Sequence, residues 1–183
     1  RGQAAVGDLG GALYKNNGTT SGQITITLSD GITLVGFDVA NQIRYTPQMF
    51  GVNPAGSASA QRVALQALFS FAPVGSIIDL GGLSYTVDAE LFSNPGVTHR
   101  NGSITLLSTV TANVWAVICA GDNCIYENLT LIGTGRVGSG STPLYQVGIN
   151  SGNNTYLGRN PANHVRIRNC EISQFTVGIF GNP

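Results

Sequence analysis

Apolar and polar residues alternate along residues 23–37, on both sides of an Asp30-Gly31 pair. Alternation around an Asp-Gly turn predicts a β-hairpin. Because an isolated hairpin is at best marginally stable, this one needs a partner in another chain or in the next domain. Residues 1–22 show no sustained period and are expected to form an extended arm or linker.

A helical pattern covers residues 57–71. Ser57 or Ser59 is expected to cap its amino end, and Pro73 follows its carboxyl end. At a spacing of 3.6 residues the pattern predicts one apolar stripe, made of Ala60, Val63, Ala64, Ala67, Leu68 and Phe71.

An internal repeat occupies the second half of the chain. Three segments carry Asn at the same place with an aliphatic residue three positions later: Asn101 with Ile104, Asn128 with Leu131, and Asn169 with Ile172. A second element follows each segment and aligns Ile118 with Ile149 and Ile179, and Ala116 with Val147 and Val177. Repeats built from short strands and turns, with no helix between them, predict a β-solenoid whose rungs stack over a continuous core.

Stacking places equivalent residues in columns. The three Asn residues are expected to point inward as a hydrogen-bonded ladder. The preceding residues should form an outward column of alternating charge, made of Arg100, Glu127 and Arg168. Trp115 shares a column with Gln146 and Thr176 and should point outward, Tyr145 should face inward, and His99 should lie near the core.

The expected fold class is therefore mainly all-β, a parallel β-helix capped by one α-helix and preceded by an arm and hairpin. Residues 1–46 form the amino-terminal part. Residues 47–183 form the start of the β-helix domain, with its helical cap at 57–71 and its rungs from residue 76 onward. The helix is expected to cover the open edges of the first rung. Because the third repeat reaches Phe180 without a closing element, we expect a longer protein with further rungs.

The content and balance of charged residues exclude one class of function. Only 10% of the residues are charged, with 9 basic against 9 acidic, so a general electrostatic nucleic-acid binder is excluded. No apolar run is long enough for a membrane helix, and no signal peptide is visible. The three cysteines, Cys119, Cys124 and Cys170, are expected to be buried thiols, although Cys119 and Cys124 could pair.

Several segments together resemble the pectate-lyase-like right-handed β-helix of phage tailspikes. They are YTPQMFGV (45–52), AQRVALQALFSFAP (60–73), GSIIDLGG (75–82), SYTV (84–87) and GVTHRNGSI (96–104). The acidic stretch typical of that family is replaced here by residues 53–59, in which serines stand where Asp caps would be.

The resemblance implies a homotrimeric virion protein. Its amino-terminal part would attach to other phage tail proteins, and its β-helix would bind, and often cleave, the surface polysaccharide of a bacterial host. The implied location is the virion tail, which acts outside the cell.

Catalysis is left open by the sequence. Glycosidic hydrolysis commonly needs two carboxylates roughly 5–10 Å apart. No two of the six carboxylates form a column suited to such a pair: Asp79, Asp88, Glu90, Asp122, Glu127 and Glu171. Arg166 and Arg168 could serve a lyase by residue type alone and are better explained as solvated strand residues. No metal-ligand spacing or phosphate-binding loop is present, so no cofactor or metal is expected.

Trp115 is the candidate site residue. It could pack against a neighbouring subunit, which is the preferred interpretation, pack under the loop at 133–163, or stack on a sugar ring.

Two other classes of protein are alternatives to the tailspike. A secreted bacterial polysaccharide lyase or glycosidase should carry a signal peptide, and an adhesin or autotransporter passenger should have repeats more regular than these Asn-to-Asn steps of 27 and 41 residues.

Overall fold

The computed structural model describes residues 14–16, 25–27, 34–37, 43–135, 145–152 and 160–181. Within these residues the fold is mainly β, with one α-helix and two parallel sheets. The larger parallel sheet contains β4 (Arg44–Tyr45), β5 (Ile77–Asp79), β6 (Ser84–Val87), β8 (Thr98–Leu106), β10 (Ile125–Ile132), β12 (Arg166–Arg168) and β13 (Glu171–Ser173). The smaller contains β7 (Leu91–Phe92), β9 (Ile118–Cys119), β11 (Val147–Asn150) and β14 (Val177–Phe180).

The predicted hairpin is present as an antiparallel pair. β2 (Thr25–Thr27) pairs with β3 (Leu34–Phe37), while the predicted turn at Asp30-Gly31 lies outside the described residues. A third strand, β1 (Tyr14–Asn16), pairs with the other edge of β3. Within the expected arm over residues 1–22, these three positions form a strand that the sequence did not reveal, because so short a strand leaves no periodic signal.

The helix α1 (Ala58–Phe71) begins and ends as predicted. Ser57 caps it by accepting a hydrogen bond from the amide of Ala60 at 3.3 Å. The predicted apolar stripe is wrong in part, because Val63 is 57% exposed and Ala60 and Ala67 are also exposed, whereas Leu68 is buried and Ala64 and Phe71 pack against the core as predicted. The buried face consists instead of Ala58, Gln61, Leu65, Leu68 and Phe69.

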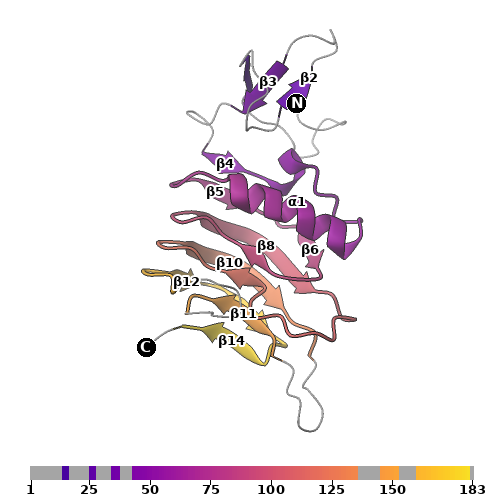
Figure 1. Cartoon of the computed structure of the whole chain (residues 1–183), viewed down its shortest axis with the longest axis vertical. Coiled ribbons are helices and arrows are strands. Elements are labelled where there is room, and N and C mark those ends of the chain that lie inside the picture. Colours follow the sequence, from indigo (N-terminus) through magenta and orange to yellow (C-terminus); the bar gives the residue numbers. More distant parts are fainter. Residues whose placement is uncertain are drawn as a thin grey trace.

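Hydrogen bonds to strand edges explain why a glutamine lies on that buried face. Gln61 accepts a hydrogen bond from the amide of Thr86 at 2.9 Å. Gln66 accepts from the amide of Phe92 at 2.8 Å and donates back to its carbonyl at 3.1 Å. The helix thus covers the edges of β6 and β7, as expected for a lid, and Figure 1 shows it lying across the first parallel strands.

The chain alternates between the two parallel sheets as it advances. β5 and β6 precede β7, β8 precedes β9, β10 precedes β11, and β12 and β13 precede β14. Each return to a sheet places the new strand beside its predecessor, so that β5, β8, β10 and β12 descend in order in Figure 1. The repeat read from the sequence therefore corresponds to neighbouring parallel strands.

Two of the predicted aliphatic columns are confirmed by the strand register, and in the third, of Ala116, Val147 and Val177, the pairing of Val147 with Val177 is confirmed. Leu131 pairs with both Ile104 and Ile172 in the larger sheet. Ile149 pairs with both Ile118 and Ile179 in the smaller sheet. The two sheets therefore bring together equivalent residues of all three repeats.

The Asn column is in register, but its expected inward orientation is wrong. Asn128 is exposed, and Asn101 is only partly buried. All three backbones are left-handed, with φ of 56° at Asn101, 53° at Asn128 and 52° at Asn169. Asn is enriched at positive φ, so the residue type recurs because the chain bends there.

A second column of left-handed residues precedes each repeat. Gly75, Gly96, Asn123 and His164 have φ of 83°, 67°, 57° and 56°. Each lies two positions before residues that pair across β5, β8, β10 and β12. The sequence gives no clear sign of this column, because Gly, Asn and His all tolerate positive φ but share no side-chain pattern.

The charge column is confirmed and extends by one residue. Glu127 is paired in register with Arg100 and Arg168, and Asp79 with Arg100. The guanidinium of Arg168 lies 2.8 Å from Glu127, and that of Arg100 lies 3.0 Å from the buried carboxylate of Asp79. Arg44 also reaches Asp79 at 3.3 Å, so ion pairs link β4 and β8 to β5, and β12 to β10.

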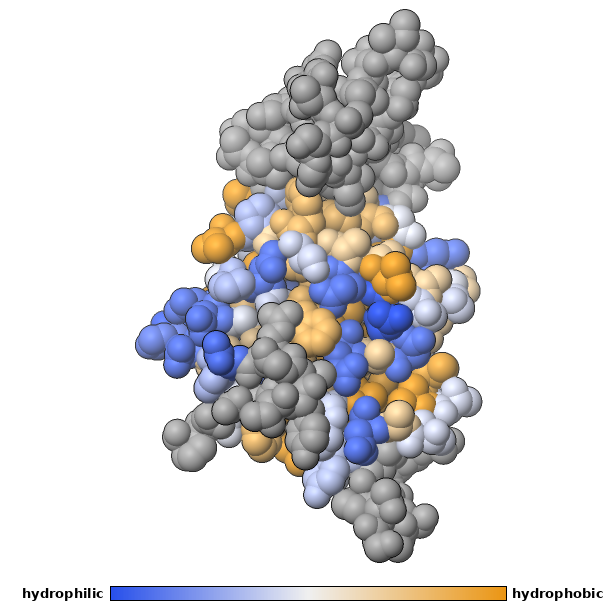
Figure 2. Space-filling model, viewed as in Figure 1, coloured by the Kyte–Doolittle hydropathy of each residue, from blue (hydrophilic) through white to orange (hydrophobic). Residues whose placement is uncertain are grey.

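The surface is mixed in polarity. Hydrophilic and hydrophobic residues are interspersed over the described part of the face in Figure 2. At the carboxyl-terminal end, Ile179 and Phe180 of β14 are 52% and 41% exposed, whereas Ile149 of the neighbouring β11 is fully buried. These side chains are therefore buried where their strand has a neighbouring strand on each side.

Candidate functional site

Trp115 lies in a short irregularity before β9. Val114 forms a bridge with Gln146, while Ile118 pairs with Ile149, so the segment containing Trp115 has one residue more than its neighbour. The predicted column of Trp115, Gln146 and Thr176 is therefore wrong by one position. An extra residue of this kind re-aims side chains relative to strict alternation.

The indole of Trp115 stacks on the ring of Tyr145. The ring centroids are 5.6 Å apart and the planes differ by 14°. Tyr145 is 42% exposed, so its predicted inward orientation is wrong, and Trp115 is half-buried. We call Trp115 and Tyr145 the aromatic pair.

Hydrogen bonds fix the backbone of both members of the aromatic pair. The amide of Trp115 donates to Glu90 Oε1 at 3.2 Å, and its carbonyl accepts from Asn150 Nδ2 at 3.2 Å. The amide of Tyr145 donates to Asn113 Oδ1 at 3.0 Å. The backbone that carries both rings is thus held by neighbouring segments, which reduces the entropy lost when a ligand binds.

The chemistry of this site suits a ligand with a flat apolar face and polar edges. Aromatic rings bury C–H groups, and nearby polar groups orient the ligand. Glu90 supplies a carboxylate beside Trp115, and Asn113 supplies an amide beside Tyr145. Such a combination can hold a sugar ring.

A buried polar cluster lies in the interior, between the two sheets. His99 is 1% exposed, as the sequence predicted, and its ring lies 4.5 Å from Phe69 and 5.0 Å from Tyr126. Its Nε2 is 2.7 Å from Ser93 Oγ, which is itself 3.4 Å from Cys124 Sγ. Burial lowers the pKa of His99 to about 3 and raises the pKa of Tyr126 well above its usual value.

This cluster lacks the arrangement of a catalytic serine and base. Ser93 Oγ donates to the carbonyl of Asn94 at 3.1 Å, so His99 Nε2 fits as the donor to Ser93. His99 Nδ1 is buried and has no hydrogen-bond partner among the described residues. A nucleophilic serine needs an imidazole that accepts its proton and is oriented through the other nitrogen.

Three of the six carboxylates considered for hydrolysis form ion pairs. Glu127 pairs with Arg168, Asp79 with Arg100, and Asp88 with Arg62 at 2.6 Å. Arg166 is exposed on β12, which agrees with a solvated strand residue. Glu171 pairs in register with Thr130, the outward polar column that the sequence predicted.

Cys119 and Cys124 are buried free thiols and Cys170 is a partly buried one, so a pairing of Cys119 with Cys124 is not formed. Within the described ranges, no cluster of three or more His, Cys, Asp or Glu side chains could hold a metal ion. Over the same ranges, no helix is long and apolar enough to span a bilayer.

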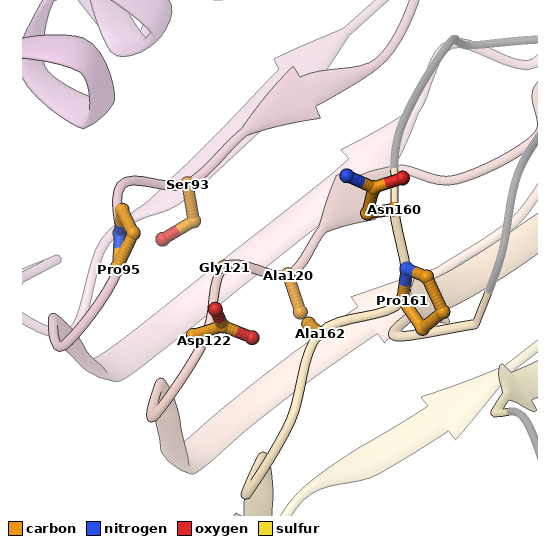
Figure 3. Close-up of a pocket in the computed structure, with 8 residues that line it drawn as sticks. All are labelled: Ser93, Pro95, Ala120, Gly121, Asp122, Asn160, Pro161 and Ala162. Carbon is orange, nitrogen blue, oxygen red and sulfur yellow. The ribbon is translucent and has the colours of Figure 1, made fainter.

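A cavity of about 260 Å³ opens where the strands of the smaller sheet end. Its described lining comes from three turns, at residues 93–95, 120–122 and 160–162 (Figure 3). We call it the turn cavity. The sequence gives no sign of this cavity, because its residues come from three separate turns and share no motif.

Comparison with known proteins identified no matching family model, curated protein or solved structure.

Proposed function

We propose that this chain is the amino-terminal segment of a phage tailspike whose described parallel sheets belong to a right-handed parallel β-helix. The observation that carries the proposal is the register: equivalent residues of three repeats pair across β8, β10 and β13, and across β9, β11 and β14. Alternation of the chain between two sheets, with each strand stacking on its predecessor, is how a solenoid is built.

The amino-terminal part supports a virion protein over a secreted enzyme. Three antiparallel strands, β1 to β3, precede the helix that covers the first parallel strands. In the proposal this part attaches to other phage tail proteins, and the protein is a homotrimer. The aromatic pair, with its exposed Tyr145, is its contact with the surface polysaccharide of the host.

The proposal gives Trp115 the role of a sugar platform. A pyranose ring packs its C–H face on the exposed side of the aromatic pair, and Glu90 and Asn113 accept or donate hydrogen bonds at its edge. The carboxylates of Asp79, Asp88 and Glu127 are engaged in ion pairs with arginines, so the proposal assigns them no part in sugar binding.

Retention on immobilised bacterial polysaccharides tests the function. We expect the full chain to be retained on one or a few capsular or O-antigen polysaccharides, and Tyr145→Ala to lose that retention while keeping its melting temperature. A Tyr14→Ala variant, altered in β1, is the matched control and should be retained normally. Failure of the chain to bind any polysaccharide in a broad panel, or unchanged retention of Tyr145→Ala, contradicts the proposal.

Mass measurement by light scattering tests the assembly. The chain has a mass of 19.0 kDa, and the proposal expects the intact protein to have three times its monomer mass. A monomer of the intact protein contradicts the tailspike assignment and favours a secreted enzyme.

A further inference from the structure

The turn cavity is built on a rigid frame. The amide of Gly96 donates to the Asp122 carbonyl at 2.7 Å, and the amide of Asn123 donates to the Asn163 carbonyl at 2.8 Å. On the other side, the amide of Ala162 donates to the Ser151 carbonyl at 2.8 Å. These bonds tie successive turns together, so the cavity is preformed.

Close backbone packing keeps one wall of the turn cavity free of side chains. A Cβ at Gly121 would lie 2.8 Å from the backbone of Ser93, Asn94 and Pro95. Since Cβ atoms do not approach backbone so closely, Gly121 is required for the turns to stack as they do. The wall is therefore fixed in position.

The lining combines apolar rings with a few polar groups. Figure 3 shows Pro95 and Pro161 on opposite sides, with Asp122 and Ala120 between them. Asn160 lies next to Pro161 and is exposed. Two saturated rings facing a space, with a carboxylate and an amide at its border, suit a polyhydroxylated ring with C–H faces.

The volume of the turn cavity and the charge of its lining restrict the class of ligand further. A volume of about 260 Å³ lies below the roughly 300–1,000 Å³ of pockets for drug-sized ligands, so it suits a single ring. Asp122 is the one ionisable side chain among the described lining residues. Its Oδ1 accepts from the amide of Asn163 at 2.6 Å and from Asn163 Nδ2 at 3.3 Å, which fixes the carboxylate at the border of the cavity.

We propose that the turn cavity is a second carbohydrate site, which takes one neutral pyranose ring and rejects uronic acids. It lies at the carboxyl ends of β7 and β9, whereas Glu90 and Trp115 lie before the amino ends of the same strands. The assignment of a carbohydrate as the ligand rests on the proposed function. The charge selectivity of the site is an addition to that function. Asp122 rejects a uronate because two carboxylates in contact repel.

Ligand-observed NMR with methyl glucoside, methyl N-acetylglucosaminide and methyl glucuronide tests the site on the full chain. We expect at least one neutral glycoside to bind, and the glucuronide to bind about tenfold more weakly or not at all. Asp122→Asn keeps an oxygen for the Asn163 amide but removes the charge, so it should narrow that difference. Glu171→Gln removes one charge from the exposed face of β13 and is the matched control, which should leave the difference unchanged.

A filling variant gives a second measurement if Asp122→Asn does not fold. Ala162→Leu should abolish binding of the neutral glycoside at this site, and Trp115→Ala should leave it intact. Absence of binding by any glycoside, equal binding of the glucuronide, or binding unaffected by Ala162→Leu would overturn the proposal. Polysaccharide retention that depends on Tyr145 would survive each of those results, so failure of the second site is distinguishable from failure of the proposed function.

Discussion

The side chain of Gln66 makes the two hydrogen bonds to Phe92 that a neighbouring strand would make. Its Oε1 accepts from the Phe92 amide at 2.8 Å and its Nε2 donates to the Phe92 carbonyl at 3.1 Å. An α-helix has no backbone groups to offer at its side, so side-chain amides must complete the edge of β7. This is how a helix terminates a parallel sheet here without leaving its edge unpaired.

Replacing Gln66 should therefore destabilise the fold. Gln66→Met keeps the length of the side chain but leaves the amide and carbonyl of Phe92 without these partners, at a cost of about 1–3 kcal/mol in the free energy of unfolding. Chemical denaturation measures this difference in the free energy of unfolding. Ser59→Ala, at an exposed position of the same helix, is the control and should change little. Equal stability of the two variants would show that the edge does not need the glutamine.

Backbone conformation should decide which residues are tolerated at Asn128. Its φ of 53° and its exposure predict that Asn128→Ala costs about 1–2 kcal/mol, because Ala has a left-handed penalty that Gly lacks. Asn128→Gly should be close to the wild type in thermal or chemical unfolding. If both variants lost the same stability, the side chain of Asn128 would contribute to that stability. This result would favour the ladder of buried amides that the sequence predicted.

Close stacking of neighbouring strands predicts different outcomes at two equivalent glycines. A Cβ at Gly148 would lie 2.6 Å from the Gly178 carbonyl oxygen and 2.7 Å from Ile172, whereas a Cβ at Gly178 would meet Ile172 at an ordinary 3.5 Å. Gly148→Ala should cost about 1–3 kcal/mol through overpacking, and Gly178→Ala should be tolerated. A tolerated Gly148→Ala would contradict the described spacing of β11 and β14.

Stability should depend on pH through His99. In the folded state the pKa of His99 is lowered from 6.5 to about 3, so between these values the unfolded chain binds a proton that the native protein does not. Stability is therefore greatest above pH 6.5 and falls on acidification by up to about 1.4 kcal/mol per pH unit.

Chemical denaturation at pH 7.5 and pH 5 measures this dependence. His99→Phe should flatten it, since an uncharged ring fills the site between Phe69 and Tyr126. His164→Asn is the control, because His164 is exposed and Asn also accepts positive φ, and the dependence should persist there. A His99→Phe variant with the same pH dependence as the wild type would exclude His99 as its source.

The parts of the fold that followed from the sequence are those where one physical demand selects one kind of residue. Left-handed bends recur as Asn101, Asn128 and Asn169, and one register position of the smaller sheet recurs as Ile118, Ile149 and Ile179, so the sequence predicted that each set aligns. The column of Gly75, Gly96, Asn123 and His164 answers the same demand with three residue types and was therefore missed.

The errors arose where tertiary contacts override local pattern. The buried face of α1 includes Gln61 because Thr86 needs a hydrogen-bond acceptor, which no hydrophobic period can reveal. One extra residue before β9 shifted Trp115 out of its expected column and beside Tyr145. The turn cavity joins residues from three separate turns, so its lining becomes visible only when the turns are stacked.

Tryptophan fluorescence gives the most direct measurement of the central claim, that the aromatic pair is a polysaccharide contact. Trp115 is the one tryptophan of the sequence, so its emission reports this site without interference. The account predicts that a polysaccharide retained by the full chain will change the emission of Trp115 saturably, with the same midpoint as binding measured by calorimetry. Calorimetric binding with unchanged emission would contradict it.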